Sequence, residues 1–131
     1  MEQTIKFIGE IHSDLKRIED CPLQENENAP EAYLEIYISY TEGIKDIVAG
    51  NKLIILTWLH LANRETLKCY RRNEIDSEKV GVFSTRSPDR PNPIGLHTVT
   101  VVEVNERWIK IFPIEVLDKT PVIDIKPFIN S

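Results

Sequence analysis

Hydrophobic and polar residues alternate with a period of two over the first half of the chain. Ile5–Ile11 alternates around Gly9, and Ala32–Tyr40 places Leu34, Ile36, Ile38 and Tyr40 on one face. Successive side chains of a strand point to opposite faces of a sheet, so both segments are predicted to be β-strands.

The second half of the chain continues this pattern. Lys52–Leu61 is nearly all apolar, which predicts a strand buried on both faces. Ile94–Val104 is long and rich in β-branched residues, and Arg107–Phe112 alternates again after a turn at Asn105–Glu106. These two segments are predicted to form a hairpin, and Val122–Ile125 a short last strand.

Helical segments are predicted to be few and short. Thr41–Ile47 is expected to form one helical turn, while residues 64–72 fit either a helix or a long loop. Strand therefore follows strand at short spacing, which favours an antiparallel barrel or sandwich. Because closure protects sheet edges, we expect a mainly β protein with a small closed antiparallel β-barrel and short helical turns.

Composition limits the class of protein. With 131 residues, of which 41% are hydrophobic and 28% charged, the chain is expected to be one soluble domain over residues 1–131. The net charge of −5 argues against a general nucleic-acid coat but leaves room for a local basic patch. The apolar run at 53–62 is too short to cross a bilayer and the start of the chain lacks the pattern of a signal peptide, so we expect a cytoplasmic protein with no membrane contact.

Cysteines and histidines indicate no metal site. Cys21 and Cys69 have no C-x-x-C spacing, and free thiols are favoured over a disulfide. His12, His60 and His97 are scattered along the sequence, so no metal is expected.

The segment Gly81–Leu96 is the strongest candidate for a functional loop. It holds three prolines, which stiffen the backbone, together with Arg86, Arg90 and Asn92, which suit a ligand that is anionic or forms hydrogen bonds. Gly95 is expected to supply a backbone angle that other residues avoid. A rigid connector between strands is the alternative interpretation. The five glycines of the chain form neither a G-x-G nor a phosphate-binding loop, so any nucleotide-like cofactor has to be held in another way.

The prolyl segment and four further motifs, in the same order, resemble the TsaA-like or TrmO family. These motifs are Ile8–Ser13, Tyr40–Ile47, Trp58–His60, Gly81–Gly95 and Asp118–Phe128. The resemblance implies a small β-barrel that uses S-adenosyl-L-methionine to methylate N6 of threonylcarbamoyladenosine at position 37, in the tRNA anticodon loop. It also implies a homodimer with the cofactor near the subunit interface, in a short form without the extra C-terminal domain of many bacterial members.

The chain departs from the family pattern at three places. Lys119 stands where the family has glycine, Ser13-Asp14 replaces a Ser-Pro pair, and Pro22-Leu-Gln24 lacks the arginine of a Pro-Arg-Gln loop.

The resemblance implies a set of cofactor contacts. These residues are Gln24, His60, Leu61, Arg86, Leu96, Phe112, Pro113, Ile114 and Glu115. Arg86 is the first candidate, for an anionic or ribose-edge contact, with a salt bridge to Asp89, Asp118 or Asp124 as the structural alternative. Asn92 is expected to bond either to its own loop or to a ligand, and a lone histidine such as His60 is ordinarily a core residue.

Methyl transfer to an amide-like N6 calls for a general base. Asp124 and Asp118 are the candidates, with Lys126 beside Asp124 on one strand face, although such an Asp–Lys pair is commonly structural.

For the tRNA, the candidate contacts are Lys68, Tyr70, Arg71 and Arg72, which also fit an ordinary solvated face. Two other functions stay open, namely a cofactor-binding module without catalysis and a methyltransferase acting on another nucleotide or small molecule.

Overall fold

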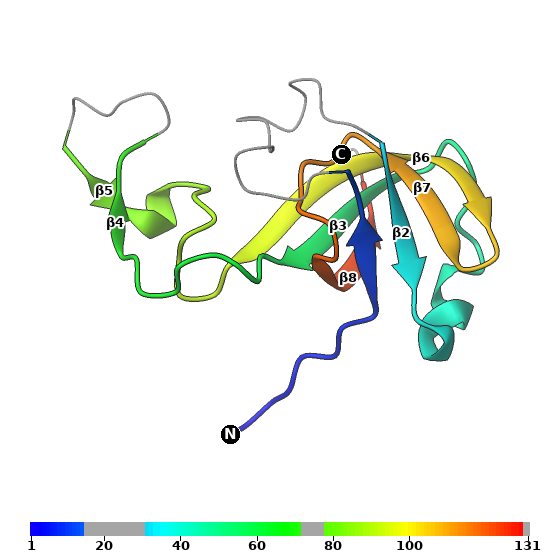
Figure 1. Ribbon diagram of the computed structural model, residues 1–131, viewed down its shortest axis with the longest axis horizontal. Helices are drawn as coiled ribbons and strands as arrows, with labels where there is room; N and C mark the ends of the chain where they lie inside the picture. Colours follow the sequence, from blue (N-terminus) through cyan, green and yellow to red (C-terminus); the bar gives the residue numbers. More distant parts are fainter. Residues whose placement is uncertain (15–30, 72–77, 130–131) are drawn as a thin grey trace.

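Six strands close into an antiparallel barrel in the structure, a computed structural model that describes residues 1–14, 31–71 and 78–129 (Figure 1). The barrel strands are β1 (Gly9–His12), β2 (Ala32–Ile36), β3 (Lys52–Trp58), β6 (Ile94–Asn105), β7 (Trp108–Phe112) and β8 (Pro121–Pro127). They are hydrogen-bonded in the order β1-β2-β7-β6-β3-β8, and β8 pairs back to β1. The predicted fold, a small closed β-barrel, is confirmed.

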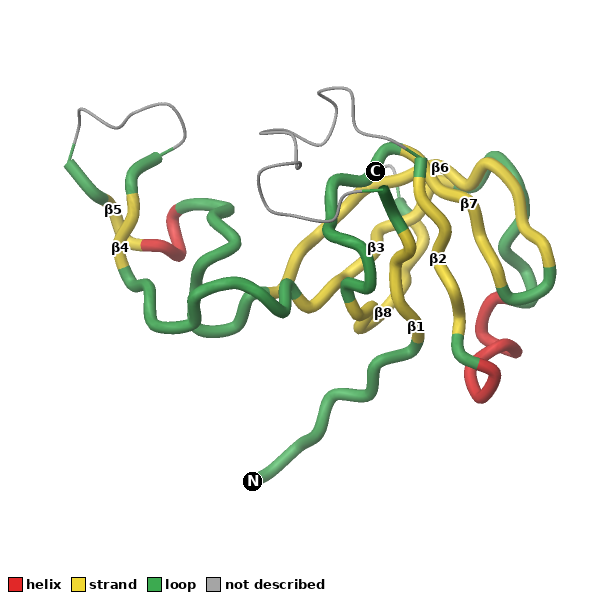
Figure 2. The backbone as a smooth tube through the Cα atoms, in the orientation of Figure 1, coloured by secondary structure: helices red, strands yellow, loops and turns green. Residues whose placement is uncertain are grey.

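A second, smaller unit projects from one side of the barrel. Residues 59–93, here called the arm, contain β4 (Lys68–Cys69), β5 (Val80–Gly81) and the 3₁₀ helix η3 (Val82–Ser84). Figure 2 shows the arm as mostly loop, leaving the barrel after β3 and returning into β6. Of the two interpretations of residues 64–72, the helix is therefore wrong for the part that the structure describes, which is loop on either side of the short strand β4.

The barrel interior follows the period-two pattern. Along β3, Leu53, Ile55 and Thr57 are buried, whereas the residues between them are half-buried. The prediction that this strand is buried on both faces is therefore wrong, because its second face lies on the outside of the barrel. The core is completed by side chains from all six strands, among them Ile11, Leu34, Val99, Ile109, Ile111 and Val122.

Two predicted strands are shorter than their patterns suggested. β2 ends at Ile36, and the 3₁₀ helix η2 (Ile38–Ile44) begins although Ile38 continues the alternation. The chain bends here because the Tyr37 amide donates to the Ile8 carbonyl at 2.9 Å and its own carbonyl accepts from the Tyr40 amide. Ile38 is consequently 78% exposed rather than part of the core. The first strand likewise covers only the end of the predicted segment.

The β6–β7 hairpin is confirmed with its turn. Asn105 pairs with Trp108, and Glu106 takes a left-handed backbone angle, φ 55°, between them. The helical turn predicted at 41–47 overlaps η2. None of the helices in the described ranges is long and apolar enough to cross a membrane.

A short seam between β1 and β8 closes the barrel. Gly9 pairs with Val122, and Glu10 pairs with Pro121. Next to the seam, Asp118 Oδ1 accepts the Ser13 amide at 3.0 Å, and the Lys119 amide donates to the Ile11 carbonyl. Lys119 has φ 69°, in the left-handed region that favours glycine, the residue that the family pattern has at this position.

Candidate functional site

Arg90 organises the prolyl loop. Its Nε donates to the Ser87 carbonyl at 2.8 Å, and its Nη2 donates to the carbonyls of Val82 and Thr85. One half-buried guanidinium thus ties three carbonyls of the η3 turn and the following loop together. Of the two arginines that the sequence offered for ligand binding, Arg90 is therefore occupied in holding the loop.

A second arginine, which the sequence did not single out, fastens the loop to the base of the arm. Arg64 Nε donates to the Pro91 carbonyl at 2.7 Å, and Arg64 Nη2 donates to Asn92 Oδ1 at 3.3 Å. The guanidinium also stacks over the Trp58 ring, 5.0 Å from its centre. Asn92 therefore takes the loop role, one of the two roles expected for it.

Arg86 differs from both. It is exposed, and within the ranges that the structure describes it forms neither a hydrogen bond nor an ion pair. The salt bridges considered for it do not form: Asp89 accepts the Asn63 amide, Asp118 accepts the Ser13 amide, and Asp124 pairs with Lys126. The Arg86 guanidinium is thus open to a ligand.

Gly95 is required for space rather than for its backbone angle, which corrects the expectation above. A Cβ at this position would lie 2.5 Å from Thr57 Oγ1 and 2.7 Å from His97 Nε2. These two atoms are 2.9 Å apart in a buried hydrogen bond between β3 and β6. The positive φ of a described glycine occurs instead at Gly50.

The remaining predicted cofactor residues lie on two surfaces. His60 and Leu61 follow the end of β3 and are exposed, so His60 lies in a turn rather than at the end of a buried strand. Leu96 on β6 and Phe112 on β7 face outward from the barrel, with 49% and 45% of their surface exposed. Gln24 lies outside the described residues.

The segment after Phe112 turns inward. Ile114 is fully buried in the core, and Pro113 and Glu115 beside it are half-buried. Since the Ile114 side chain packs in the barrel, only backbone groups of this residue can contact a ligand.

The candidate catalytic residues lie in two different places. On β8, Lys126 Nζ lies 3.2 Å from Asp124 Oδ2, and both side chains remain about half exposed. This confirms that they share a face of the strand. Asp118 lies in the turn before β8, where its carboxylate accepts the amide of Ser13, the residue directly after β1.

Two cavities adjoin these elements. The larger, about 950 Å³, lies between η2, the start of β3 and the end of β8, and Asp124 lines it. The smaller, about 510 Å³, lies between the N-terminal residues 3–7 and the base of the arm at Trp58, Arg64 and Asn92. Neither cavity contains a predicted cofactor residue.

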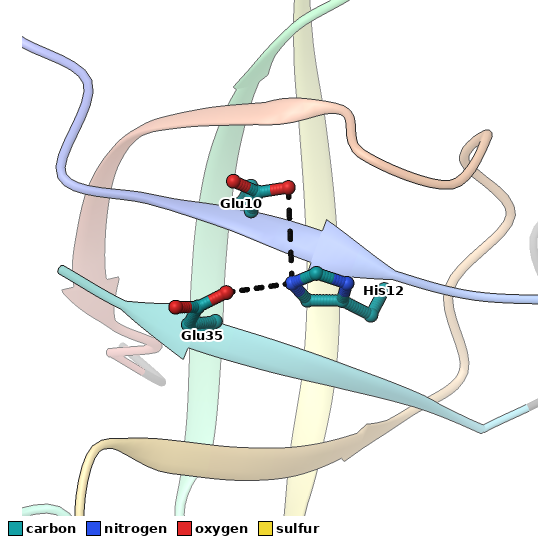
Figure 3. A group of neighbouring side chains, drawn as sticks. All are labelled: Glu10, His12 and Glu35. Atoms are coloured by element: carbon teal, nitrogen blue, oxygen red, sulfur yellow. Dashed lines mark hydrogen bonds and ion pairs between the residues drawn. The ribbon is translucent and has the colours of Figure 1, made fainter.

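A further polar cluster on the outside of the barrel joins β1 and β2 to Arg107, the residue directly before β7. His12 Nε2 lies 2.8 Å from Glu35 Oε1 and 3.7 Å from Glu10 Oε2. Figure 3 shows the His12 ring pointing toward both carboxylates. The Arg107 guanidinium binds the other oxygen of Glu35. The hydrogen bond from Arg107, and next that from His12, hold the pKa of Glu35 below its usual 4.5.

The same cluster affects Tyr37. Partial burial, and then the 3.0 Å hydrogen bond to Glu10, raise the pKa of the Tyr37 hydroxyl. Glu10 and Glu35 face each other across the β1–β2 pair, and like charges in that position need a cation between or beside them. Arg107 supplies that charge, so we assign the cluster to strand pairing although its three side chains are of types that bind metals.

The candidate tRNA contacts lie on the arm. Lys68 is exposed on β4, Tyr70 is 42% exposed under Lys79, and Arg71 Nη1 donates to the Ser84 carbonyl at 3.2 Å. Arg72 lies outside the described residues.

Comparison with known proteins gives a consistent result. The profile of the tRNA-methyltransferase O N-terminal domain matches residues 10–131. A probable S-adenosyl-L-methionine-binding protein of Archaeoglobus fulgidus is 40% identical over 97% of this chain and 34% of its own length. Another, from Methanothermobacter thermautotrophicus, is 37% identical over 98% of this chain and 91% of its own length.

Among solved structures, the crystal structure of TrmO from Pseudomonas aeruginosa superposes with a TM-score of 0.74 at 27% identity. The match covers 98% of this chain and 57% of the crystallised one. The chain thus spans about a third of the Archaeoglobus relative and just over half of the Pseudomonas protein.

Proposed function

The chain belongs to the tRNA-methyltransferase O N-terminal domain family, and from this premise we propose that it methylates tRNA with S-adenosyl-L-methionine as the methyl donor. The observation that carries the proposal is the family match, which spans both the barrel and the arm. Relatives at 37–40% identity are named as binding S-adenosyl-L-methionine, which supports this cofactor. For the acceptor we propose N6 of threonylcarbamoyladenosine at position 37.

The cofactor is proposed to lie between the arm and the outer face of the barrel. Arg86, His60 and Leu61 supply the arm side, and Leu96 and Phe112 supply an apolar wall. All of these side chains are exposed and none lines either cavity of the single chain. We therefore propose that a second copy of the chain completes the site, with the exposed Leu67 and Phe83 of the arm at the interface.

The bound cofactor supplies an electrophilic methyl group on a positively charged sulfur. The residues of the chain then have to align the acceptor with that methyl and remove a proton, and alignment contributes most of the acceleration. We propose Asp124 as the proton acceptor, because its carboxylate lines the larger cavity, and Lys126 as the group that positions it. Asp118 is assigned to closing the barrel.

Three measurements test this function. Saturating S-adenosyl-L-methionine is expected to stabilise the protein against thermal unfolding, by about 2.7 kcal/mol at 100 times its Kd. Arg86→Met is expected to weaken binding about tenfold, through loss of a charge-assisted contact, whereas Lys45→Met at an exposed site is expected to have no effect. Mass spectrometry of anticodon-loop nucleosides should then show a new methyl on threonylcarbamoyladenosine.

A binding module without catalysis is the second candidate, and the names of the relatives, which specify binding alone, favour it. Binding of the cofactor without methyl transfer to any tRNA would support this candidate against the enzyme.

The oligomer and the tRNA contacts have their own tests. A sedimentation mass equal to the 15.1 kDa of one chain, at the protein concentration of the assay, would contradict the dimer. We propose that Lys68, Tyr70 and Arg71 of the arm contact tRNA together with Arg72. Neutralising Lys68 and Arg71 should weaken tRNA binding and flatten its dependence on salt, and an unchanged salt slope would exclude this surface.

A further inference from the structure

Two carboxylates converge on one ring nitrogen in the polar cluster on the outside of the barrel. Figure 3 shows the same nitrogen of His12 joined to both Glu10 and Glu35. One oxygen of each glutamate and a ring nitrogen of His12 all lie within 4.8 Å of one another. Imidazole nitrogens and carboxylate oxygens are among the ligands that Zn²⁺ takes in proteins.

The register of two barrel strands sets this arrangement. Glu10 and His12 are two residues apart on β1, so their side chains leave the same face of the strand. Glu35 on β2 is the direct partner of Glu10. The His12 ring also packs against Trp108, with 5.2 Å between the ring centres. The three groups are therefore positioned by regular β-structure.

Each carboxylate is oriented by a hydrogen bond to its other oxygen. The Tyr37 hydroxyl donates to Glu10 Oε1 at 3.0 Å, while Glu10 Oε2 is the oxygen that faces His12. The Arg107 guanidinium binds Glu35 Oε2, while Glu35 Oε1 is the oxygen that contacts His12. Hydrogen bonds of this kind hold carboxylate ligands in place around metal ions in proteins.

The charges of the cluster leave room for a cation. Glu10 and Glu35 carry two negative charges, and Arg107 supplies one positive charge to Glu35. A histidine that binds a metal is neutral, so no other member of the cluster then compensates the second negative charge. A divalent ion supplies that compensation. Metal binding therefore adds to the strand pairing described above and does not replace it.

The spacing of the three atoms also fits a small ion. Around a tetrahedral Zn²⁺ with ligands at about 2.0–2.1 Å, neighbouring ligand atoms are about 3.3–3.4 Å apart. The distances from His12 Nε2 to the two glutamate oxygens, 2.8 and 3.7 Å, lie on either side of this value. The His12 side chain is 32% exposed and those of Glu10 and Glu35 are 24% and 19% exposed, so an ion can enter from solvent.

We propose that Glu10, His12 and Glu35 bind a divalent transition-metal ion, Zn²⁺ first among them, with water completing its coordination. The ion links β1 to β2 on the outside of the barrel. The scattered histidines predicted no metal, because two of the three ligands are glutamates that only the strand register brings to His12. None of the residues proposed for the cofactor, for proton transfer or for tRNA belongs to this site, so it does not depend on the proposed function.

The experiment is a titration of the full chain, free of any histidine tag and stripped of metal with EDTA, with Zn²⁺ and separately with Mg²⁺. Calorimetry is expected to show one Zn²⁺ per chain, bound about a hundredfold or more tightly than Mg²⁺, because Mg²⁺ prefers an all-oxygen shell and keeps its own waters. NMR spectra of the histidine rings should show shifts at His12 and none at His60 or His97.

Three variants locate the site. His12→Gln should weaken Zn²⁺ binding at least about tenfold, and His60→Gln, at an exposed histidine of the arm, is the matched control with unchanged affinity. Tyr37→Phe keeps all three ligands but loses the hydrogen bond that orients Glu10, so it should weaken binding about tenfold. Circular dichroism verifies that each variant is folded, and the ring spectra of the wild type test the site even if His12→Gln does not fold.

Three outcomes each overturn the proposal: no binding of Zn²⁺, ring shifts at His60 in place of His12, or equal affinity of folded His12→Gln and wild type. A loss of affinity in His60→Gln as large as that in His12→Gln shows adventitious binding to surface histidines and overturns it as well. None of these measurements uses S-adenosyl-L-methionine or tRNA, so their result is independent of the methylation assay.

Discussion

Close contacts at single residues decide where the barrel strands can approach one another. At Gly95 the β6 backbone passes directly beside the buried hydrogen bond between Thr57 and His97. A glycine in the sequence shows only that a side chain is absent. Whether it is needed for its backbone angle or for the space depends on neighbours from another strand, so the reason could not be predicted.

We expect Gly95→Ala to destabilise the protein by about 1–3 kcal/mol, because the added methyl overpacks a buried site. Gly81→Ala is the control: nothing lies within 4 Å of a Cβ there, and φ is −60°. Urea unfolding of both variants measures the difference. Equal stability of Gly95→Ala and wild type would show that Thr57 and His97 can move apart at no cost.

The arm depends on a small number of side-chain contacts with the backbone. Its two-stranded sheet is only two residue pairs long (Figure 2). Arg90 and Arg64 together donate five hydrogen bonds that hold its loops. The prolines allowed a stiff loop to be predicted. The sequence did not show which arginine holds the loop and which is exposed. Arg86 and Arg90 are four residues apart with similar neighbours, and only the folded turn distinguishes them.

Arg90→Lys is expected to loosen the arm while leaving the barrel intact. A lysine ammonium cannot reproduce the planar fork that binds three carbonyls. Hydrogen exchange should therefore accelerate at amides 82–90, with the barrel amides unchanged. Arg86→Lys is the comparison, since Arg86 has no partner in the described residues. Equal protection of the arm in both variants would contradict the role assigned to Arg90.

At the scale of the whole molecule, alternation and turn residues were sufficient to predict the closed barrel. Strand ends were harder to predict from the sequence, because Ile38 and Tyr40 fit both a continuing strand and a helical turn. A backbone hydrogen bond with Ile8 decides between the two. The Glu10–His12–Glu35–Arg107 cluster could not be predicted from the sequence either. Its members come from the register of β1 against β2 and the hairpin turn before β7, which no local pattern specifies.

Because of this cluster, the stability of the fold is expected to depend on pH. Arg107 and His12 lower the pKa of Glu35 in the folded protein, so the ionised carboxylate stabilises the fold above its usual value of 4.5. That stabilisation is lost as the pH falls through the lower folded pKa. Glu35→Gln should cost about 1–2 kcal/mol at pH 7 and make stability less sensitive to acid.

Urea unfolding at several pH values between 7 and 3 measures this effect. Glu65→Gln, at an exposed site, should retain the pH dependence of the wild type. If Glu35→Gln loses stability with acid as steeply as the wild type, the carboxylate contributes nothing to acid sensitivity.

The pairing of β1 with β8 can form only late in the synthesis of the chain on the ribosome. Ser13 and Asp118, which meet beside the seam, are 105 residues apart. At about 5–20 residues per second, β1 emerges about 5–20 seconds before the strand that closes it. During that interval one edge of β1 exposes unpaired backbone groups to any neighbouring nascent chain. The last strand of the barrel therefore ends this exposure as well as completing the core.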